Sequence, residues 1–358
     1  MQETLIVEVD ASVNPHSHLR EGDELMSAAI REVYNGGVEV VGGMPNTKIP
    51  LTTADRVTTY NARLRELTST HRPMTFISIA QVTEETTFED MLAFVEADIW
   101  DFKLYPRDRT TNSMFGIVCY WRVIEVIKRA AAYIFKTTGR RIRVHPHPEH
   151  PAMTFIGRDA EYLFLPVAYM LIEETEAIII WEHGTDARCI PHWKRLAESG
   201  RFYVTLTAHH LATNEDKTFG DVRATCKPSI KTEPDRAALV QLVCEDHPWV
   251  MLGADDAPHD MSRKHVHEGR CDCGAYTAPF LVPLCAHVLD QLMHTEAGIQ
   301  IFNNFTSRNA RKLYGLPPAV RKLKLARQKT EIPACYRLGP WTVESFWAKQ
   351  VIEWSFAE

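Results

Sequence analysis

Short apolar runs alternate with longer amphipathic segments along most of this chain. The apolar runs are rich in Val, Ile, Leu and Phe, as expected of buried parallel strands. Eight runs are predicted to be strands: 5–9, 38–41, 74–80, 99–105, 141–145, 177–181, 202–207 and 249–253. Between them, the apolar spacing predicts helices at 24–34, 87–96, 120–137, 158–175, 190–198 and 235–245.

Eight strand–helix units within about 255 residues match the size of a (β/α)8 barrel. We therefore predict an α/β fold of the TIM-barrel type, with extra helices and loops at the C-terminal end. The chain would form one domain over residues 1–358, with the barrel core at about 5–275 and a helical extension at 276–358. In such barrels the functional side chains stand at the C-terminal ends of the strands.

Side chains able to bind a metal stand at the ends of five predicted strands. They are His16, His18, Lys103, His145, His183 and Asp255. An H-x-H pair is a weak signal by itself, and a lone lysine at a strand end more simply packs its stem and exposes its amine. At one barrel rim, however, the six would meet. A neutral lysine amine can also take up carbon dioxide and become an oxygen ligand for two metals.

Seven short motifs carry a resemblance to a known family. They are HSHLR at 16–20, MPN at 44–46, KLYP at 103–106, TTNS at 110–113, VH at 144–145, EH at 182–183 and GADDAPH at 253–259. In number and order they resemble the dihydroorotases of the single-function bacterial and fungal type, in the amidohydrolase superfamily. The resemblance runs from about residue 5 to LYGLPP at 313–318 and covers most of the chain.

The resemblance implies a zinc-dependent cyclic amidohydrolase that interconverts L-dihydroorotate and N-carbamoyl-L-aspartate in de novo pyrimidine biosynthesis. The implied zinc ligands are His16, His18 and Asp255 for one ion, His145 and His183 for the other, and N6-carboxylated Lys103 between them. A hydroxide bridging the two ions would attack the ring amide. Asp255 would act first as general base and then as general acid.

The resemblance also implies seven substrate-binding residues: Arg20, Asn46, His259, Thr110, Thr111, Lys227 and Gly274. The first three suit a carboxylate held in a fixed orientation. The threonines correspond to a loop that closes over substrate, and the last two to backbone contacts with the substrate ring. From local sequence alone, Asn46 also fits a turn, His259 a supporting or surface histidine, and the threonines an ordinary polar loop.

Three departures from the family pattern affect this prediction. The fifth-strand histidine is usually followed by Gly-Glu, whereas HPHPEH stands at 145–150. Three histidines there leave the ligand ambiguous, and His145, directly after the apolar run, is the predicted one. Asp256 stands where a serine is common, where it would either raise the pKa of Asp255 or face solvent, and the segment 214–223 is altered.

The departures favour one alternative, a divergent paralogue that acts on another cyclic amide, imide or lactone. A non-enzymatic alternative is an inactive relative that serves as a scaffold. Loss of metal ligands would support the scaffold, but none of the ligands is lost from the sequence.

Composition limits the classes of binding partner and the cellular compartment that are expected for this protein. A net charge of -6 argues against nucleic acid, and no apolar run reaches the length of a membrane span. Eight scattered cysteines and an opening segment unlike a secretory leader predict a reduced, cytoplasmic protein. The expected partner is a small anionic cyclic amide, and the resemblance allows for a homodimer.

Overall fold

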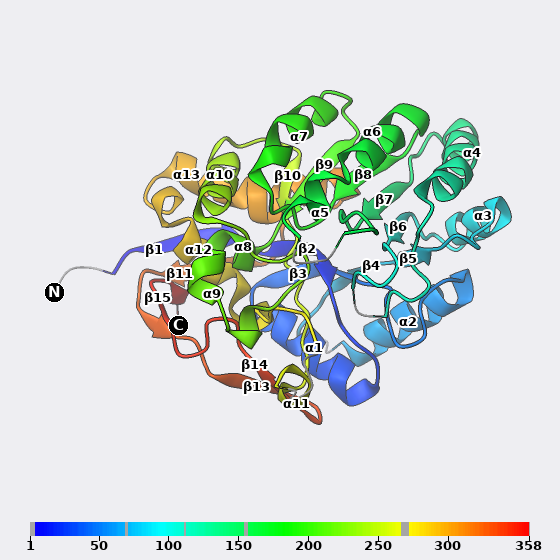
Figure 1. Ribbon diagram of the computed structural model, residues 1–358. Helices are drawn as coiled ribbons and strands as arrows, with labels where there is room; N and C mark the ends of the chain where they lie inside the picture. The colour runs from blue at the N-terminus through cyan, green and yellow to red at the C-terminus, as the bar shows by residue number, and fades with distance from the viewer. Residues whose placement is uncertain (1–3, 69–70, 111, 154–156, 266–271, 358) are drawn as a thin grey trace.

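Parallel strands form the predicted (β/α)8 barrel (Figure 1). The computed structural model describes residues 4–68, 71–110, 112–153, 157–265 and 272–357. The barrel strands are β2 (Ser12–Ser17), β3 (Val38–Gly43), β4 (Thr75–Ile77) with β5 (Ile79–Val82), β6 (Asp101–Leu104), β7 (Arg143–Pro146), β8 (Ile178–Trp181), β9 (Phe202–Leu206) and β10 (Val250–Leu252). β4 and β5 are separated only by Ser78 and act as one strand, so the barrel has the predicted eightfold order.

Main-chain contacts between the first and last barrel strands close the barrel. Ser17 of β2 and Asp256, beyond β10, form a parallel bridge. The amide of Asp255 donates to the carbonyl of His16 at 2.9 Å, and the amide of His18 donates to the carbonyl of Asp256 at 2.8 Å. Closure therefore joins the H-x-H motif to Asp255, although 237 residues separate His18 from Asp255.

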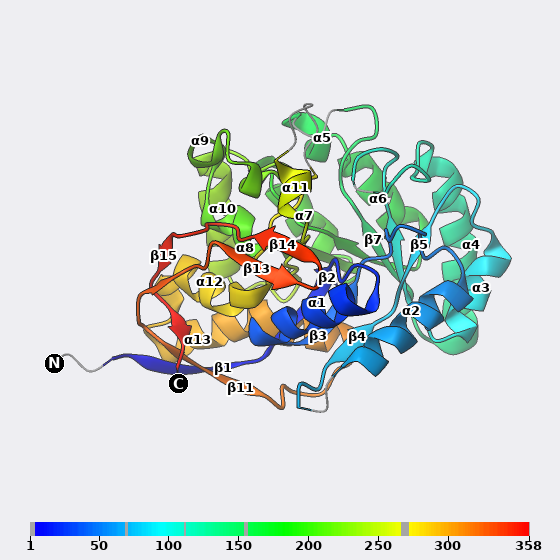
Figure 2. The same cartoon turned by 90° about the horizontal axis from the view of Figure 1, so that it is seen from below.

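The longer helices lie against the outside of the barrel (Figures 1 and 2). They are α1 (Asp23–Asn35), α2 (Ala54–Leu67), α3 (Phe88–Glu96), α4 (Tyr120–Thr138), α6 (Leu165–Glu174), α7 (Ile190–Ala197) and α10 (Glu233–Cys244). Thr87 and Thr232 begin α3 and α10 with reciprocal caps that satisfy first-turn amides. The helix expected at 158–175 is divided into α5 (Asp159–Tyr162) and α6.

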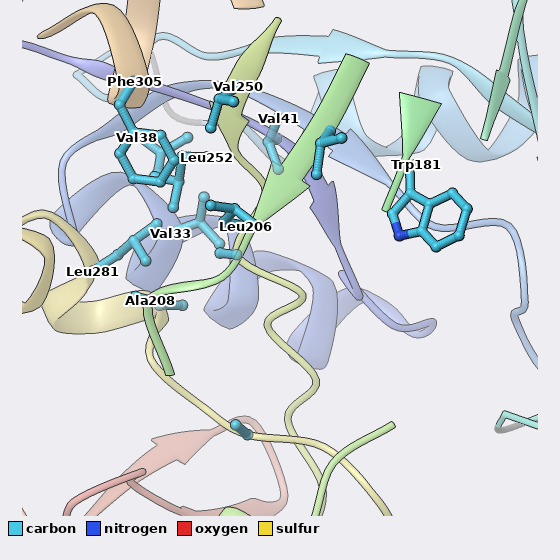
Figure 3. Close-up of a cluster of buried hydrophobic side chains, with 14 of the residues drawn as sticks. Val33, Val38, Val41, Trp181, Leu206, Ala208, Val250, Leu252, Leu281 and Phe305 are labelled. Carbon is cyan, nitrogen blue, oxygen red and sulfur yellow. The ribbon is translucent and has the colours of Figure 1, made fainter. Parts of the chain in front are cut away.

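The side chains of the barrel strands alternate in direction and pack into two hydrophobic cores. Outward-facing residues join the main core under the helices, where Figure 3 shows Leu206, Leu252 and Leu281. A smaller core fills the barrel with Val13, Val40, Ile77, Ile79, Ile180, Met251 and Ala310. Side chains alternate along a strand, so further inward-facing positions lie nearer the C-terminal ends of the strands. These positions lie beyond the smaller apolar core and can hold polar side chains.

The first predicted strand is not part of the barrel. β1 (Ile6–Asp10) pairs antiparallel with β11 (Lys322–Ala326), and the first barrel strand is β2. Every residue of β2 is buried, but its sequence SVNPHS reads as polar. Hydrophobicity alone therefore selected the neighbouring run, and the prediction of 5–9 as a barrel strand is wrong.

The C-terminal extension contains strands as well as helices. Helices α12 (Leu281–Val288), α13 (Glu296–Asn303) and α14 (Asn309–Tyr314) agree with the prediction for 276–358. After them come β11 and the short strands β12 (Thr330–Glu331), β13 (Cys335–Leu338), β14 (Trp341–Glu344), β15 (Val351–Ile352) and β16 (Ser355–Phe356). Phe346 and Trp354 of this segment are fully buried, so its short strands are anchored by large apolar side chains.

The cysteines and the helices bear on two further predictions, a reduced chain and the absence of a membrane span. The seven cysteines among them are all free thiols, in agreement with a chain that has no disulfide framework. None of the helices described combines the length and apolar character needed to cross a bilayer.

Candidate metal centre and substrate cleft

His16, His18 and Asp255 meet at the C-terminal rim of the barrel. Oδ1 of Asp255 lies 3.0 Å from Nε2 of His16 and 3.2 Å from Nε2 of His18. All three side chains are buried. Two imidazole nitrogens and one carboxylate oxygen therefore face a common point, which is a donor set that zinc binds.

Left-handed backbone conformations occur at three residues of this rim. The φ angles are 63° at Arg20, 39° at His183 and 48° at Asp255. Such angles cost a non-glycine residue about 1–3 kcal/mol and persist only where the surrounding structure holds them. At the ends of β2, β8 and β10, they turn the chain so that these side chains point into one site.

Lys103 of β6 is completely buried inside the barrel, with 0% of its surface exposed. Its Nζ contacts Oε2 of Glu182 and lies 5.0 Å from the centre of the Tyr105 ring. Oε2 of Glu182 also lies 3.1 Å from Nδ1 of His16. Burial lowers the pKa of the Lys103 amine well below its ordinary value. The neutral amine favoured by burial is the form that reacts with carbon dioxide.

His147, rather than the predicted His145, lies beside His183. Nδ1 of His147 is 3.0 Å from Nε2 of His183. Nε2 of His147 is 2.8 Å from Oε2 of Glu149, a carboxylate that fixes the orientation of the ring. Both histidines are buried. They form a second pair of imidazoles, and His183 lies 5.1 Å from the His16 ring, measured between ring centroids.

His145 lies one pleat deeper in the barrel than His147. β7 continues to Pro146, so both histidines follow the same inward-facing row of alternating side chains. The two ring nitrogens of His145 lie 2.9 Å from Asp101 and 3.0 Å from Glu182. The sequence predicted His145 because it directly follows the apolar run. His145 contacts two buried carboxylates, whereas His147 is the histidine beside His183.

Asp101, which contacts His145, is held by Arg143 in a two-pronged ion pair. Nε and Nη2 of Arg143 each donate to a carboxylate oxygen of Asp101 at 2.8 Å. The guanidinium carbon lies 4.8 Å from the centre of the Tyr314 ring. Burial opposes ionisation of Asp101, but Arg143 and His145 outweigh it and lower the pKa of this carboxyl. The buried network therefore supports the barrel wall beneath the candidate metal centre.

We expect Arg143→Met to lower the free energy of unfolding by about 3–5 kcal/mol, because Asp101 would become a buried charge without its cation. Chemical denaturation near neutral pH measures this loss. Since the folded-state pKa of Asp101 is lowered, the contribution of the pair is present above the unfolded pKa of 3.8 and disappears as the pH falls through the folded pKa. The loss in Arg143→Met should shrink accordingly in acid.

The double variant Arg143→Met with Asp101→Asn is the control for this ion pair. It removes the stranded carboxylate and should regain part of the lost stability. A double variant no more stable than Arg143→Met would mean that packing of the Arg143 stem, rather than the ion pair, supports the barrel.

The donors of the barrel mouth fit a divalent metal. One ligand atom each from His16, Glu182 and His183 lies within 4.8 Å of the others, as do atoms from His16, His18 and Asp255. Burial lowers the pKa of His16 to about 3 and that of His183 well below its ordinary value. The rings are therefore neutral and keep a lone pair, and neutral imidazoles beside carboxylates are the donors that zinc and similar metals take.

An open cleft of about 450 Å³ leads to these donors. Arg20, Asn46 and His259 line it together with His18. Nη2 of Arg20 lies 3.0 Å from Nε2 of His259, and Nε of Arg20 donates to the carbonyl of Pro258 at 2.8 Å. These contacts fix the guanidinium plane at the wall of the cleft. A planar cation held in this way suits a carboxylate ligand.

A smaller cavity adjoins the cleft. The predicted site residues lining it are His18, Arg20, Thr110, Lys227, Asp255, His259 and Gly274. A Cβ atom at Gly274 would lie 2.5 Å from Cβ of Ala257, so the close approach of these two segments requires glycine there. Five of the predicted substrate residues thus lie around Asp255, Asn46 lines the adjoining cleft, and Thr111 lies outside the described residues.

Asp256 is buried and belongs to the barrel closure. Its Oδ1 accepts hydrogen bonds from the amide and hydroxyl of Thr277 at 3.0 and 2.6 Å. Burial raises the pKa of Asp256 to about 7. The neighbouring Asp255 nevertheless stays ionised, because His16 and His18 outweigh burial and lower its pKa well below the ordinary value. Neither sequence alternative for Asp256 is therefore supported: it does not face solvent, and the pKa of Asp255 is not raised.

Three side chains of the site were not among the predicted site residues: His147, Glu149 and Glu182. A sequence signal did exist for the first two, since His147-Pro148-Glu149 keeps the His-x-Glu spacing usual in the family. Glu182 was recognised only as part of a motif. Its contacts with Lys103, His16 and His145 exist only once the barrel has formed, because these residues come from three other strands: β6, β2 and β7.

No family model matches the chain. Curated relatives nevertheless cover almost all of it. The chain is 28% identical to the dihydroorotase of Alkalilimnicola ehrlichii over 348 residues, 95% of this chain and 96% of the relative. It is 30% identical to a probable dihydroorotase of Schizosaccharomyces pombe over 319 residues, 88% of each chain. The chain belongs to the dihydroorotase family.

Solved structures agree with membership in the dihydroorotase family. A crystal structure of dihydroorotase from Saccharomyces cerevisiae, in complex with 5-fluoroorotic acid, matches with a TM-score of 0.82 and 26% identity over 98% of both chains. An L-hydantoinase from Arthrobacter aurescens shares the fold, with a TM-score of 0.78 and 14% identity. The comparisons confirm the predicted barrel and the predicted class of cyclic-amide hydrolase within a metalloenzyme family.

Proposed function

We propose that this chain interconverts L-dihydroorotate and N-carbamoyl-L-aspartate at a binuclear zinc centre in the barrel mouth. The observation that carries the proposal is a cleft in which Arg20, Asn46 and His259 stand beside the donor His18, together with an adjoining cavity that Arg20 and His259 share with Asp255. L-Dihydroorotate carries a carboxylate for the first group and a cyclic amide for the second. Family membership supports the same reaction.

The proposed ligand set differs from the sequence prediction at one position. His16, His18 and Asp255 would hold one ion, His147 and His183 would hold the other, and N6-carboxylated Lys103 would supply further oxygen donors. His147 replaces His145 because it lies 3.0 Å from His183, with Glu149 orienting its ring. A carboxylate behind a ligating imidazole is a usual feature of zinc sites.

Carboxylation of Lys103 is a balanced addition. The neutral Nζ attacks carbon dioxide, an N–C bond forms, and one proton leaves to solvent. The carbamate keeps one N–H, and the carboxylate of Glu182, which contacts this nitrogen, can accept a hydrogen bond from it. The side chain then contributes two oxygens and a negative charge, where the buried amine contributed neither.

When bound, two zinc ions supply a hydroxide near neutral pH and polarise the amide carbonyl. The residues of the chain supply binding and proton transfer. Asp255 is ionised and held between His16 and His18, so it can accept a proton as the nucleophile attacks. It returns that proton to the departing ring nitrogen. Arg20 and His259 keep the ring in one orientation throughout.

A matched pair of substrates tests this proposal. Dihydrouracil has the ring of dihydroorotate without the carboxylate. Purified, zinc-supplied protein should open L-dihydroorotate at least about 1,000-fold more efficiently than dihydrouracil, because dihydrouracil would leave the cation of Arg20 without an anionic partner. Equal turnover of both rings would contradict the anion-binding role of the cleft and would favour the paralogue acting on another ring. No turnover of either ring by zinc-loaded protein would contradict the proposal.

We expect Arg20→Met to raise the KM for L-dihydroorotate by about 30-fold or more, because a charged hydrogen bond contributes about 2–3 kcal/mol. The turnover of dihydrouracil, if measurable, should not change. Steady-state kinetics of both substrates provide the test. Lys48→Met is the matched control, since Lys48 also lines the cleft but is exposed. Equal effects of the two substitutions would mean that general positive charge, not the fixed fork of Arg20, binds the substrate.

A further inference from the structure

A second group of metal-ligating side chains shares no residue with the barrel-mouth donors. His209 and His210 belong to α8 (Ala208–Ala212), and Cys226 follows the short helix η2 (Val222–Ala224). We refer to these three residues as the His–His–Cys cluster. One ligand atom from each lies within 4.8 Å of the others, and all three side chains are buried. The function proposed above makes no use of them.

His209 is an unpartnered donor inside this cluster. Both of its ring nitrogens are buried, and neither has a hydrogen-bond partner among the described residues. Leaving a buried polar group unsatisfied is unfavourable, so the ring nitrogens of His209 are suited to bind a ligand. Burial lowers the pKa of His209 to about 4. The ring is therefore neutral and carries a lone pair available to a cation.

His210 and Cys226 already have the separation of two ligands on one tetrahedral ion. Sγ of Cys226 lies 3.6 Å from Nε2 of His210. Zinc bonds of about 2.3 Å to sulfur and about 2.0 Å to nitrogen place the two atoms roughly 3.5 Å apart at a tetrahedral angle. Both groups also converge on the carbonyl of Pro228, at 3.2 Å from Sγ and 3.0 Å from Nε2. An ion in this position would replace two protons that now share one acceptor.

The surroundings of His210 suit a ligating imidazole. Its Nδ1 lies 2.7 Å from the hydroxyl oxygen of Thr207. Nε2 faces the carbonyl of Pro228 and therefore carries the ring proton without an ion; if that proton moves to Nδ1, Thr207 can accept a hydrogen bond from it and Nε2 gains a lone pair for a cation shared with Cys226. Metal-bound histidines commonly use their second nitrogen in this way.

We propose that His209, His210 and Cys226 bind one thiophilic divalent cation, with zinc as the expected metal, through a set of ligands distinct from those of the barrel-mouth centre. Binding releases the Cys226 thiol proton to solvent, and the ring proton of His210 moves to Nδ1. No oxidation or reduction is involved. Because Lys227, next to Cys226, lines the cavity beside Asp255, the ion would hold that wall of the cavity in place.

Cobalt provides a probe specific to this site. Full-length protein is stripped of metal with a chelator and titrated with Co²⁺, while the near-ultraviolet spectrum is recorded. A thiolate bound to Co²⁺ gives a charge-transfer band, whereas the nitrogen and oxygen donors proposed for the barrel mouth do not. We expect a thiolate band that saturates at one Co²⁺ per chain and is displaced by Zn²⁺. The result is independent of whether dihydroorotate is turned over.

Substitutions assign the band. Cys226→Ser should abolish it, whereas Cys285→Ser, which removes another buried thiol, should leave it intact. His209→Gln retains the thiol but removes one ligand, and should weaken Co²⁺ binding by about ten-fold or more as followed by the band. Absence of a thiolate band, a band that survives in folded Cys226→Ser, or unchanged affinity in His209→Gln would each overturn the proposal. If Cys226→Ser does not fold, the affinity of His209→Gln decides.

Discussion

Lys103→Ala is expected to reduce ring opening of L-dihydroorotate by about 1,000-fold or more and to lower the content of tightly bound zinc, because the proposed bridge between the two ions is lost. The side chain is completely buried and in contact with Glu182, so its removal leaves a cavity beneath the metal centre. Steady-state kinetics and metal analysis of the purified variant measure the two effects.

Chemical rescue separates a carboxylated lysine from a merely structural one. A small carboxylate such as acetate should enter the cavity of Lys103→Ala and restore part of the activity, because it supplies the missing oxygen ligands. Wild-type protein in ¹³C-bicarbonate should also show a carbamate carbon resonance that Lys103→Ala lacks. Wild-type protein without this resonance would contradict the carboxylated form, whatever the activity of the variant.

The second large effect is expected from a pair of neighbouring histidines. His147→Ala should lose about 100-fold or more in activity and one of the two zinc ions, because a ligand of His183's ion is removed. His145→Ala should keep both ions but unfold more easily, by about 1–3 kcal/mol, because Asp101 and Glu182 lose a shared partner. Metal analysis and chemical denaturation of both variants distinguish the two roles.

The two alanine variants serve as controls for each other, since each removes a buried imidazole: His145 belongs to β7, and His147 directly follows that strand. Loss of zinc from His145→Ala with retention in His147→Ala would restore the assignment made from the sequence. Loss of zinc from both would mean that the deeper network, including Asp101, sets the geometry of the ligands above it. In that case Arg143→Met should lose zinc as well.

The buried network of Arg143, Asp101 and His145 affects the stability of the barrel more directly than it affects activity. Arg143, Asp101 and His145 place charge on β6 and β7, whereas residues such as Val13 and Ile180 belong to the apolar core inside the barrel. The polar wall stabilises only while its charges stay paired. Substitutions there should therefore change stability first and activity only through the position of Lys103 and His147.

The amino-acid sequence by itself determined the elements and the chemistry of this protein. Amphipathic spacing predicted α1, α3, α4 and α7 nearly to the residue, because a helix that covers a barrel must be apolar on one side only. Motif order predicted the dihydroorotase family, the barrel and the cleft residues Arg20, Asn46 and His259. The family and the barrel are confirmed, because helix spacing and short motifs depend on residues close together in the chain, whereas the roles of the cleft residues stay predictions.

Tertiary structure alone decided which residues meet. β2 is buried by its neighbours despite its polar sequence, and β1 is diverted to pair with β11, more than 300 residues away. His147 was separated from His145 by the pleat of β7, which depends on where the strand ends in the sheet. The contact of Glu182 with Lys103, and the gathering of His209, His210 and Cys226, join different segments of the chain. Such contacts depend on strand register and barrel closure, which local sequence patterns do not encode.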